Sequence, residues 1–514
     1  MARHSAPYLL GIDFGTESCR VGIFTLDGTP VVFAATGYAT AHPRPGWAEQ
    51  SPDDWWAALV ASTRTALDES RVDPGDIAGI GYDATSATVV ALDRHDEPLR
   101  PAIMWMDVRA AAQASRMAAV NEAGRRVPTS AELLPFKAAW LKEHEPGVYA
   151  RTTHLLDAPD WLGFRLTGEF RTNENSASSK MFHRRAEGGF PLDLYEAAGC
   201  ADALAKLPPI VQPLGTPLGA LTARAASDLG LRPGTPVAEG CIDAYAGQLG
   251  LNVLAPGRMA LITGSSHVLL GQAPASVAGS GLVGTFADAV IPGQCSVEAA
   301  LVSSGSALKW FRDTFAGDAV AEAERRGLAA YDVLNEASRD IPPGSEGLVI
   351  NPYFQGSRTP FADSHARAII WGLSLRHTQA HVYHALQESI CYGLAHCLRT
   401  MAEHDYHVER LVACGGALKS RAWMQLHADV TGVPIVLTRV QDAVALGSCV
   451  MAAAGAGLYP SLADAAAAMV HEVETLTPDA ARHAEYAYFV DAYIATYPRL
   501  RDLQHAMAMH LTEG

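Results

Sequence analysis

The sequence predicts an α/β protein built of two large domains. The chain has 514 residues, more than one hydrophobic core usually supports. Short apolar runs alternate with segments of helical spacing, which is typical of α/β architectures. Both halves open with an apolar strand, a turn of small polar residues and a second strand, around residues 13–18 and again around 263–266. We therefore expect an internal structural duplication with domains at 1–256 and 257–514.

Local patterns place the elements of the first half. Apolar runs that we expect to form one sheet lie within 8–24 (two runs around the turn) and at 30–34, 77–82, 89–92 and 102–105. Ser51 followed by Pro52 predicts the start of a helix. From about residue 110 to 170 the spacing becomes helical, with starts at Ser130 and Asp160 and an end near Gly168.

Composition excludes several classes of protein. The formal net charge of −16 argues against a nucleic-acid or anionic-membrane partner but not against a nucleotide. The 8 cysteines are scattered and form no Cys-x-x-Cys pair, which disfavours zinc ribbons and thiol redox sites and suits a reducing cytosol. The N-terminus lacks the apolar run of a signal peptide, and no apolar stretch is long enough to span a bilayer. We expect a soluble, cytoplasmic protein.

The two turns have the residue types that a phosphate site needs. Gly15 lets the backbone approach a phosphate, Thr16 and Ser18 offer hydroxyl donors, and Arg20 could balance charge. An ordinary polar hairpin is the alternative, which the second turn at 263–266 makes less attractive. Two such strand–turn–strand elements across a cleft resemble the phosphate clamp of the actin and hexokinase superfamily. This resemblance implies a two-domain actin/hexokinase-like (ribonuclease H-like) ATPase fold with a central ligand cleft.

Five ordered motifs resemble those of the FGGY family of carbohydrate kinases. They are a first phosphate motif, a second phosphate motif, the Gly-x-Arg-Thr-Pro-x-x-Asp segment of xylulose and ribulose kinases, a family signature with a mismatch at Gln387, and an adenosine segment. In that order they lie at 13–16, 264–266, 356–363, 368–388 and 414–432. The resemblance implies an ATP-dependent carbohydrate kinase, with an N-terminal sugar-binding domain and a C-terminal nucleotide-binding domain that carries C-terminal helices.

The resemblance also implies the catalytic and metal residues. Asp243 matches the family's general base, and a carboxylate can accept the proton of a sugar hydroxyl during phosphoryl transfer. The alternative for Asp243 is an N-cap of a helix beginning at Ala244, and both roles can hold together. Asp13 is implied to orient Mg²⁺ through water, with Asp243 as the second metal residue. A buried salt bridge or a turn role is the alternative for Asp13.

Residues of both halves are implied to bind ATP. They are Asp13, Gly15, Thr16, Glu17, Ser18, Arg20, Gly264, Ser265, Gly305, Lys309, Gly415, Gly416 and Ser420. The sequence departs from the family at Ala417, where a third glycine is common, and at Ser420, where glycerol kinases often have Asn. Lys309 could reach a phosphate or remain solvated.

Sugar contacts are expected from the first domain. The candidates, besides Asp243, are Trp47, Glu49, Asp83, Thr85, Trp105 and Asp107. Carboxylates can pair with hydroxyls and tryptophan faces can pack against C–H groups, although core packing is an equal alternative for both tryptophans. The Asp-Ala-Thr and Trp-Met-Asp-x-Arg segments look closest to the ribulose kinases. The Met-His-Gly of xylulose kinases and the Gln-Arg-Glu of glycerol kinases are absent.

The favoured interpretation is an ATP-dependent kinase of a small ketose, ribulose first. Alternatives are a xylulose kinase or a polyol (erythritol or ribitol) kinase. From other classes, an actin-like ATPase without a sugar substrate and a sugar-binding protein without catalysis remain open. The expected partners are a small-molecule sugar and ATP, and the composition is compatible with a homodimer. His377, His381, His384 and Glu388 share a helical face, for which a polar or interface-facing side is favoured over a metal site.

Overall fold

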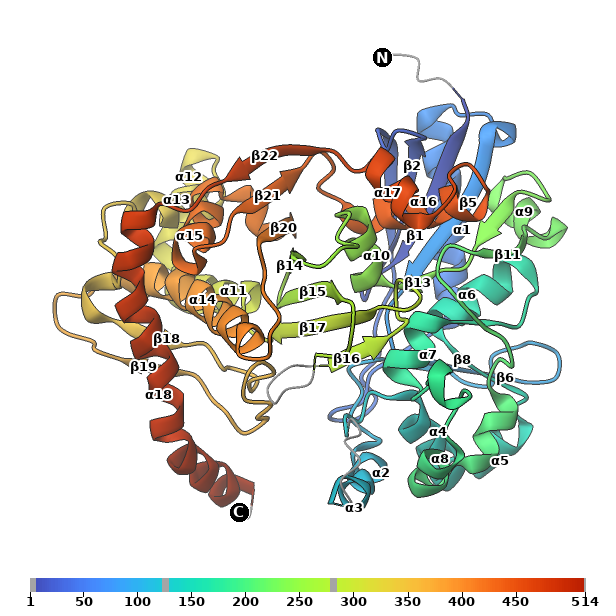
Figure 1. The fold of residues 1–514 in the computed structure, drawn as a ribbon, viewed down its shortest axis with the longest axis horizontal. Coiled ribbons are helices and arrows are strands. Elements are labelled where there is room, and N and C mark those ends of the chain that lie inside the picture. The colour runs from blue at the N-terminus through green and yellow to red at the C-terminus, as the bar shows by residue number, and fades with distance from the viewer. Residues whose placement is uncertain (1–5, 123–128, 278–283, 513–514) are drawn as a thin grey trace. The chain divides into compact units, whose positions relative to one another are not determined.

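The computed structural model describes residues 6–122, 129–277 and 284–512 (Figure 1). The chain divides into two compact units. The first comprises Met1–Leu254, Phe286–Cys295 and Asp442–His471, and the second comprises Ala255–Thr285, Ser296–Gln441 and Glu472–Gly514. The segment from Asp442 to His471, which the sequence predicts to lie in the second domain, therefore belongs to the first unit.

A seven-stranded sheet forms the centre of the first unit. Its strands run in the order β11 (Pro217–Ala220), β12 (Pro236–Ala238), β5 (Ile77–Ala84), β1 (Tyr8–Phe14), β2 (Ser18–Thr25) and β3 (Pro30–Gly37), with β13 (Cys241–Ile242) paired to β5. The meander β1–β2–β3 is antiparallel, as predicted, and β1 pairs with β5 in parallel.

Helix α16 (Ala443–Gly455) packs on β1 and β5 because glycines leave room for its backbone (Figure 1). A Cβ at Gly11, Gly79 or Gly81 would lie 2.4, 2.9 or 1.9 Å from a backbone oxygen of α16. Side chains alternate along a strand, so Asp13 and Asp83 face the same side as these glycines. The glycines therefore bring α16 to the strand ends that carry the two aspartates.

A separate four-stranded sheet corrects one prediction. Its order is β4 (Glu49–Gln50), β7 (Ala102–Ile103), β6 (Val89–Leu92) and β8 (His154–Asp157). The runs at 89–92 and 102–105 therefore do not extend the central sheet. They pair instead with partners far along the chain, since β6 is hydrogen-bonded to β8. A further two-stranded sheet joins β9 (Thr172–Asn173) and β10 (Val211–Gln212).

The first unit also contains twelve α-helices among its described residues. They are α1 (Pro52–Ser70), α2 (Ala111–Ser115), α3 (Met117–Glu122), α4 (Leu134–His144), α5 (Pro146–Arg151), α6 (Ala158–Thr167), α7 (Glu174–Lys180), α8 (Leu192–Ala198), α9 (Ala223–Leu229), α10 (Asp243–Gly250), α16 and α17 (Leu462–Met469). Ser51 caps α1, as predicted. The starts expected at Ser130 and Asp160 are wrong by a few residues, since α4 begins at Leu134 and Asp157 caps α6.

The second unit contains the second strand–turn–strand element. Its seven-stranded sheet has the order β16 (Gly284–Ala287), β17 (Cys295–Leu301), β15 (His267–Ala273), β14 (Arg258–Thr263), β20 (Arg410–Gly415), β21 (Ile435–Thr438) and β22 (Glu472–Leu476). The β14–β15 pair is antiparallel, and β14 lies parallel to β20. The unit repeats the local plan of the first, since a strand of the hairpin again pairs in parallel with a later strand.

The remaining elements of the second unit are helices and a two-stranded antiparallel sheet. They are α11 (Gly305–Phe315), α12 (Gly317–Arg326), α13 (Ala330–Ser338), α14 (Gln379–Ala402), α15 (Arg421–Thr431), α18 (Ala480–Thr512) and the pair β18 (Val349–Asn351) and β19 (Ile369–Trp371). Helix α14 is largely buried and contacts α15 and α18.

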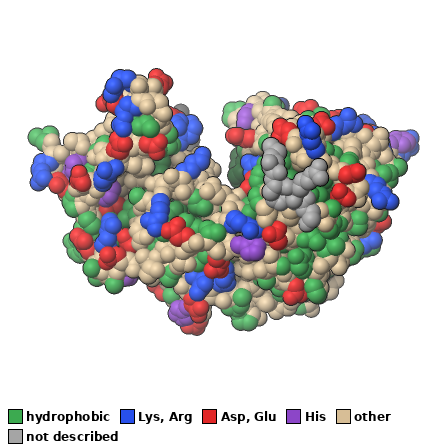
Figure 2. Space-filling model, turned by 90° about the horizontal axis from the view of Figure 1, so that it is seen from above, with side chains coloured by type: hydrophobic (Ala, Val, Ile, Leu, Met, Phe, Trp, Pro, Cys, Tyr) green, Lys and Arg blue, Asp and Glu red, His purple; other side chains and the backbone are tan. Residues whose placement is uncertain are grey.

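The surface carries charged side chains of both signs. Acidic and basic side chains are interspersed over the described part of the face in Figure 2. In the ranges that the structure describes, we find no helix long and apolar enough to cross a membrane.

Candidate active site

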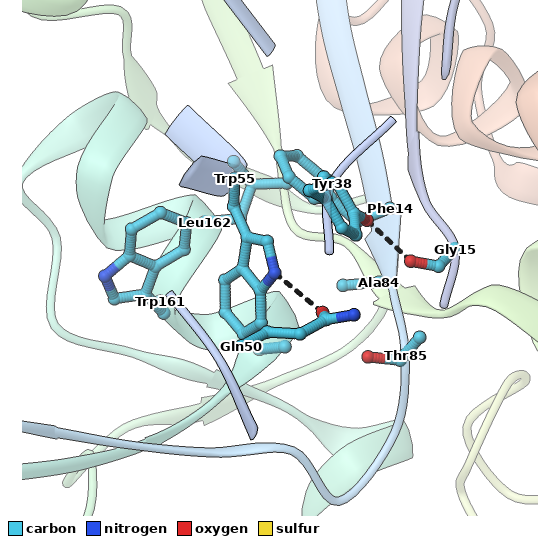
Figure 3. A pocket seen from close by; sticks show the side chains of 10 residues that line it. Phe14, Gly15, Tyr38, Gln50, Trp55, Ala84, Thr85, Trp161 and Leu162 are labelled. Carbon is cyan, nitrogen blue, oxygen red and sulfur yellow. Dashed lines mark hydrogen bonds between the residues drawn. The ribbon is translucent and has the colours of Figure 1, made fainter. Parts of the chain in front are cut away.

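The first turn is held in place by three hydrogen bonds, of which Figure 3 shows the one from Tyr38 to Gly15. The amide of Gly15 donates to the carbonyl of Ser18 at 3.0 Å and closes the turn. The Tyr38 hydroxyl donates to the Gly15 carbonyl at 2.5 Å, and the Gln50 amide donates to the Thr16 carbonyl at 2.7 Å. Gln50 in turn accepts from the indole of Trp55 at 2.8 Å. The turn is therefore rigidly supported by its own unit.

A small cavity lies behind this turn. Its lining includes Tyr38, Gln50, Trp55, Thr85 and Trp161. Its volume of about 10 Å³ accommodates about one water molecule. It is therefore too small to hold a sugar.

Three carboxyl groups lie at Arg20 and the neighbouring strand ends. The Arg20 guanidinium lies 2.7 Å from a carboxylate oxygen of Asp442 and 3.6 Å from one of Asp13. Asp83 lies opposite Asp13 in the β1–β5 register. The Asp83 side chain accepts a hydrogen bond of 2.5 Å from Ser448. Sequence patterns missed Asp442 and Ser448, which reach the site on α16; the alternating glycines of β1 and β5 were the available signal.

The protonation of this cluster is strongly perturbed. Burial raises the pKa of Asp13, and the charges of Asp442 and Asp243 raise it further, while Arg20 lowers it. Burial and the neighbouring Asp13 likewise raise the pKa of Asp83. The single guanidinium of Arg20 pairs with both Asp442 and Asp13. A bound cation would further reduce the repulsion among the carboxylates.

Asp243 lies at the start of α10, beside the end of β5. The preceding strand β13 pairs with β5 in the register Cys241 to Asp83. Asp243 is the first helical residue, and its Oδ1 accepts from the Ala244 amide at 2.6 Å. The predicted N-cap position is therefore wrong by one residue, because the helix already begins at Asp243. A carboxylate there also benefits from the positive end of the helix dipole.

Three residues that were predicted to bind the sugar all contact Arg109 instead. Arg109 binds Asp107 through two hydrogen bonds of 2.8 and 2.7 Å and lies 2.8 Å from Glu49. Its guanidinium also stacks on Trp47, 3.7 Å from the ring centroid, and Trp47 packs against Trp140. These contacts favour a packing role for Trp47, Glu49 and Asp107, held together by the buried Arg109.

Thr85 and Trp105 lie nearer the first turn. The Trp105 indole donates to the Thr16 hydroxyl at 3.2 Å. The Thr85 amide donates to the Phe14 carbonyl at 3.1 Å, and the Thr85 hydroxyl pairs with Thr88 at 3.1 Å. Of the predicted sugar residues, Asp83, Thr85, Trp105 and Asp243 therefore gather around β5 and the first turn. Glu17 is exposed, while Thr16 and Ser18 are half-buried.

A buried lysine was missed by the sequence reasoning. Lys137 on α4 is fully buried and donates to the carbonyls of Ala87 and Met104 at 2.6 and 2.7 Å. Burial lowers its pKa to about 7. Lys137 thereby fixes the loops that carry Thr85 and Trp105. A lone lysine in a helical pattern gives no sequence signal for burial.

The predicted nucleotide residues of the second unit converge on its turn. Gly264 donates to the Ser266 carbonyl at 2.8 Å, and the amide of Gly305 at the start of α11 donates to the Gly264 carbonyl at 3.2 Å. Gly415 lies opposite Thr263 in the β14–β20 register. A 3₁₀ turn, Gly416–Lys419, then leads to Ser420, which caps α15. Lys309 lies apart from these contacts, 66% exposed and 2.7 Å from Asp313.

Glycines at these turns differ in whether the fold needs them. A Cβ at Gly305 would lie 2.4 Å from the Gly264 carbonyl oxygen, so packing requires a glycine there. A Cβ at Gly15, Gly264 or Gly416 would meet no atom closer than 3.6 Å, and none of the three has a positive φ. The open space at these glycines is what a closely approaching phosphate or nucleotide requires.

The histidines of α14 do not form a metal site. Ser345 bonds the His384 ring at 2.9 Å and donates to Glu388 at 2.7 Å. Among the residues that the structure describes, no group of three or more His, Cys, Asp or Glu is arranged to hold a metal ion. This holds for the acidic cluster of the first unit as well.

Comparison with protein families assigns both units. Residues 8–250 match the N-terminal domain and residues 259–456 the C-terminal domain of the FGGY family of carbohydrate kinases. The chain belongs to the FGGY family. It is therefore an ATP-dependent carbohydrate kinase, a transferase with a sugar and ATP as small-molecule partners, as the motifs predicted.

Named FGGY relatives cover nearly the whole chain. A ribulokinase of Geobacillus thermodenitrificans is 30% identical, covering 89% of this chain and 88% of its own. A xylulose kinase of Bacillus subtilis is 28% identical over 97% and 98% of the two chains. The crystal structure of a xylulose kinase from Rhodospirillum rubrum superimposes with a TM-score of 0.84 at 29% identity, covering 97% of this chain and 100% of that one. The predicted two-domain actin/hexokinase-like fold is thereby confirmed.

Proposed function

We propose that this FGGY kinase phosphorylates a small ketose, ribulose first, with Asp243 as the general base. The observation that carries this proposal is the pairing of β13 with β5, which sets Asp243 beside the Asp83–Thr85 segment. An exposed sugar hydroxyl is a poor nucleophile, and a carboxylate within hydrogen-bond reach can take its proton as the phosphoryl group is transferred. Thr85 belongs to that segment, and the Trp105 indole donates to the Thr16 hydroxyl of the first turn.

In this proposal each unit has its own task. In the first unit, Asp83 and Lys137 fix the loops around the acceptor, and Thr16 and Ser18 offer hydroxyls to a phosphate. In the second unit, the turn at Gly264 and Ser265 binds phosphate oxygens, with the Ser265 amide as the donor, because the Gly264 amide already donates to the Ser266 carbonyl. The segment from Gly415 to Ser420 binds the adenosine.

Mg²⁺ fits the donor set of the first unit. Asp13 and Asp243 offer carboxylate oxygens, the ligands this cation prefers. Burial raises the pKa of Asp13, and the neighbouring acids Asp442 and Asp243 raise it further; a cation would offset the charge of those acids. Two carboxylates without a third ligand suit an ion that keeps waters and shares the phosphates of ATP. Bound there, Mg²⁺ would neutralise charge on the phosphates.

Ribulose is favoured over xylulose by the residues near the acceptor. The Asp-Ala-Thr form at Asp83 and the Trp-Met-Asp form at Trp105 resemble the ribulose kinases, and ribulokinases are among the relatives at 30% identity. Xylulose is the second candidate, because the xylulose kinase of Bacillus subtilis matches over more of both chains.

The acceptor is tested by measuring ADP release with MgATP and a panel of sugars. The panel contains D- and L-ribulose, D- and L-xylulose, ribitol, erythritol and glycerol. We expect a ribulose isomer to give the highest kcat/KM. A higher value for xylulose or a polyol would replace ribulose by that acceptor. ATP consumption that no sugar stimulates would instead support an actin-like ATPase.

A further inference from the structure

The Thr263 hydroxyl links the second turn to the nucleotide segment. Thr263 ends β14 immediately before the turn Gly264–Ser266 and is 2% exposed. Its Oγ1 donates to the Cys414 carbonyl at 2.7 Å and accepts from the Ala417 amide at 3.1 Å. One hydroxyl therefore binds the chain on both sides of Gly415 and Gly416.

A histidine pair makes a second link on the other side of the turn. His267 begins β15 directly after the turn, and His427 lies on α15, whose first turn is capped by Ser420. Their Nε2 atoms are 3.3 Å apart and both side chains are buried. The turn is thus flanked by two residues, Thr263 and His267, that each bond to the segment from Cys414 to His427.

The hydrogen-bond partners fix the protons of this pair. His427 Nδ1 lies 2.8 Å from the Trp423 carbonyl, which can only accept, so Nδ1 carries the proton. The Nε2 atom of a neutral His427 is then an acceptor, and His267 donates to it through its own Nε2. Burial lowers the pKa of His267 to about 3 and that of His427 to about 4, so both rings stay neutral near pH 7.

We infer that Thr263 and His267 are positioning residues that hold the second turn and the segment Cys414–His427 as one unit, so that adenosine and phosphate binding depend on each other. The inference rests on the proposed nucleotide-binding role of these segments. A turn anchored at both ends to the adenosine segment cannot move without it. Loss of either link should then weaken binding of a ligand that touches only the other segment.

Matched variants at Thr263 test the inference. Thr263→Val removes the hydroxyl at nearly constant shape, while Thr263→Ser keeps it. Dissociation constants for MgADP and for adenosine alone are measured by calorimetry on the full chain. We expect Thr263→Val to weaken both ligands roughly tenfold, since the Cys414 carbonyl and the Ala417 amide lose their hydrogen bonds to Thr263. Thr263→Ser should stay within about twofold, and the KM of the sugar should not change.

A second pair keeps the test decisive if Thr263→Val does not fold. His427→Gln can still accept from His267 and donate to the Trp423 carbonyl, whereas His427→Phe can do neither. We expect the phenylalanine variant to weaken both ligands and the glutamine variant to restore most of the affinity. If Thr263→Val or His427→Phe binds adenosine with wild-type affinity, the inference is overturned, while the proposed function is not affected. Failure of the unmodified protein to bind MgADP would overturn the proposed function, and the inference with it.

Discussion

Ser448 on α16 donates a hydrogen bond of 2.5 Å to Asp83 at the end of β5, although 365 positions separate the two residues. Both side chains are fully buried. The bond ties the segment Asp442–His471 to the sheet that carries Asp13. A late part of the chain thereby completes the acidic cluster of the first unit.

Replacing Ser448 by Ala should destabilise the protein measurably. The substitution removes the Ser448 hydroxyl, the only hydroxyl that donates to Asp83 among the described residues. The buried Oδ2 atom of Asp83 then loses this hydrogen bond. The expected loss is about 1–3 kcal/mol in the free energy of unfolding, measured by urea denaturation. Ser389→Ala is the control, since Ser389 bonds only a carbonyl of its own helix. Equal stability of the two variants would contradict this role of Ser448.

Alanine at Gly264 should impair ATP binding without impairing folding. A Cβ there has no neighbour closer than 3.7 Å, but it would occupy the space that we assign to a phosphate. The KM for ATP should rise roughly tenfold, the equivalent of about 1.4 kcal/mol, at an unchanged melting temperature. In contrast, Gly305→Ala should lower the melting temperature, because its Cβ would lie 2.4 Å from a backbone oxygen. An unchanged KM for ATP in Gly264→Ala would argue against phosphate binding at this turn.

Stability should depend on pH through Glu388. Burial raises the pKa of Glu388 from 4.5 to about 7, although Ser345 and Gly344 donate hydrogen bonds to it. The folded protein therefore keeps a proton that the unfolded chain has lost, and stability falls as pH rises from 4.5 to about 7. Glu388→Gln stays neutral and lacks this contribution. The melting temperature of the wild type relative to the variant should fall over that interval.

The control for this experiment is Glu403→Gln, because Glu403 is exposed at the end of the same helix. Its melting temperature should follow that of the wild type at each pH. A melting temperature of the wild type relative to Glu388→Gln that is constant with pH, or that rises toward pH 7, would refute the assignment.

Lysine cannot replace Arg109. The guanidinium makes two hydrogen bonds to Asp107, pairs with Glu49 and stacks on Trp47, and an ammonium cannot reproduce this planar arrangement. Arg109→Lys should lose about 1–3 kcal/mol in the free energy of unfolding, measured by urea denaturation. Arg399→Lys, at an exposed pair with Asp491, should be within about 0.5 kcal/mol of the wild type. Stability equal to that control would show the Arg109 contacts to be dispensable.

Local patterns in the sequence predicted the elements that local interactions determine. The β1–β2 and β14–β15 turns and the capped start of α1 at Ser51 follow from periodicity and capping, which act over a few residues. The predicted starts of α4 at Ser130 and α6 at Asp160 were wrong. Helix α4 begins at Leu134, followed by Pro135, and the side chain of Asp157 caps α6.

Long-range partners could not be predicted in the same way. No periodicity connects Asp442 to Arg20, or Ser448 to Asp83, because those pairs depend on how α16 packs on the sheet. Residue type suggested that Glu49 and Asp107 meet a sugar, yet both are bound by Arg109. A charged side chain in a motif can serve packing as well as a ligand, and only the contacts distinguish the two.

The central claim is that Asp243 accepts a proton from the sugar, and ADP release by Asp243→Asn tests it most directly. Asparagine keeps the shape and can still accept from the Ala244 amide, but it cannot take a proton. With MgATP and the preferred sugar, we expect turnover to fall by about 10²-fold or more, while calorimetric binding of adenosine, which we assign to the segment from Gly415 to Ser420, stays unchanged. Sugar-stimulated turnover that survives in Asp243→Asn would contradict the account.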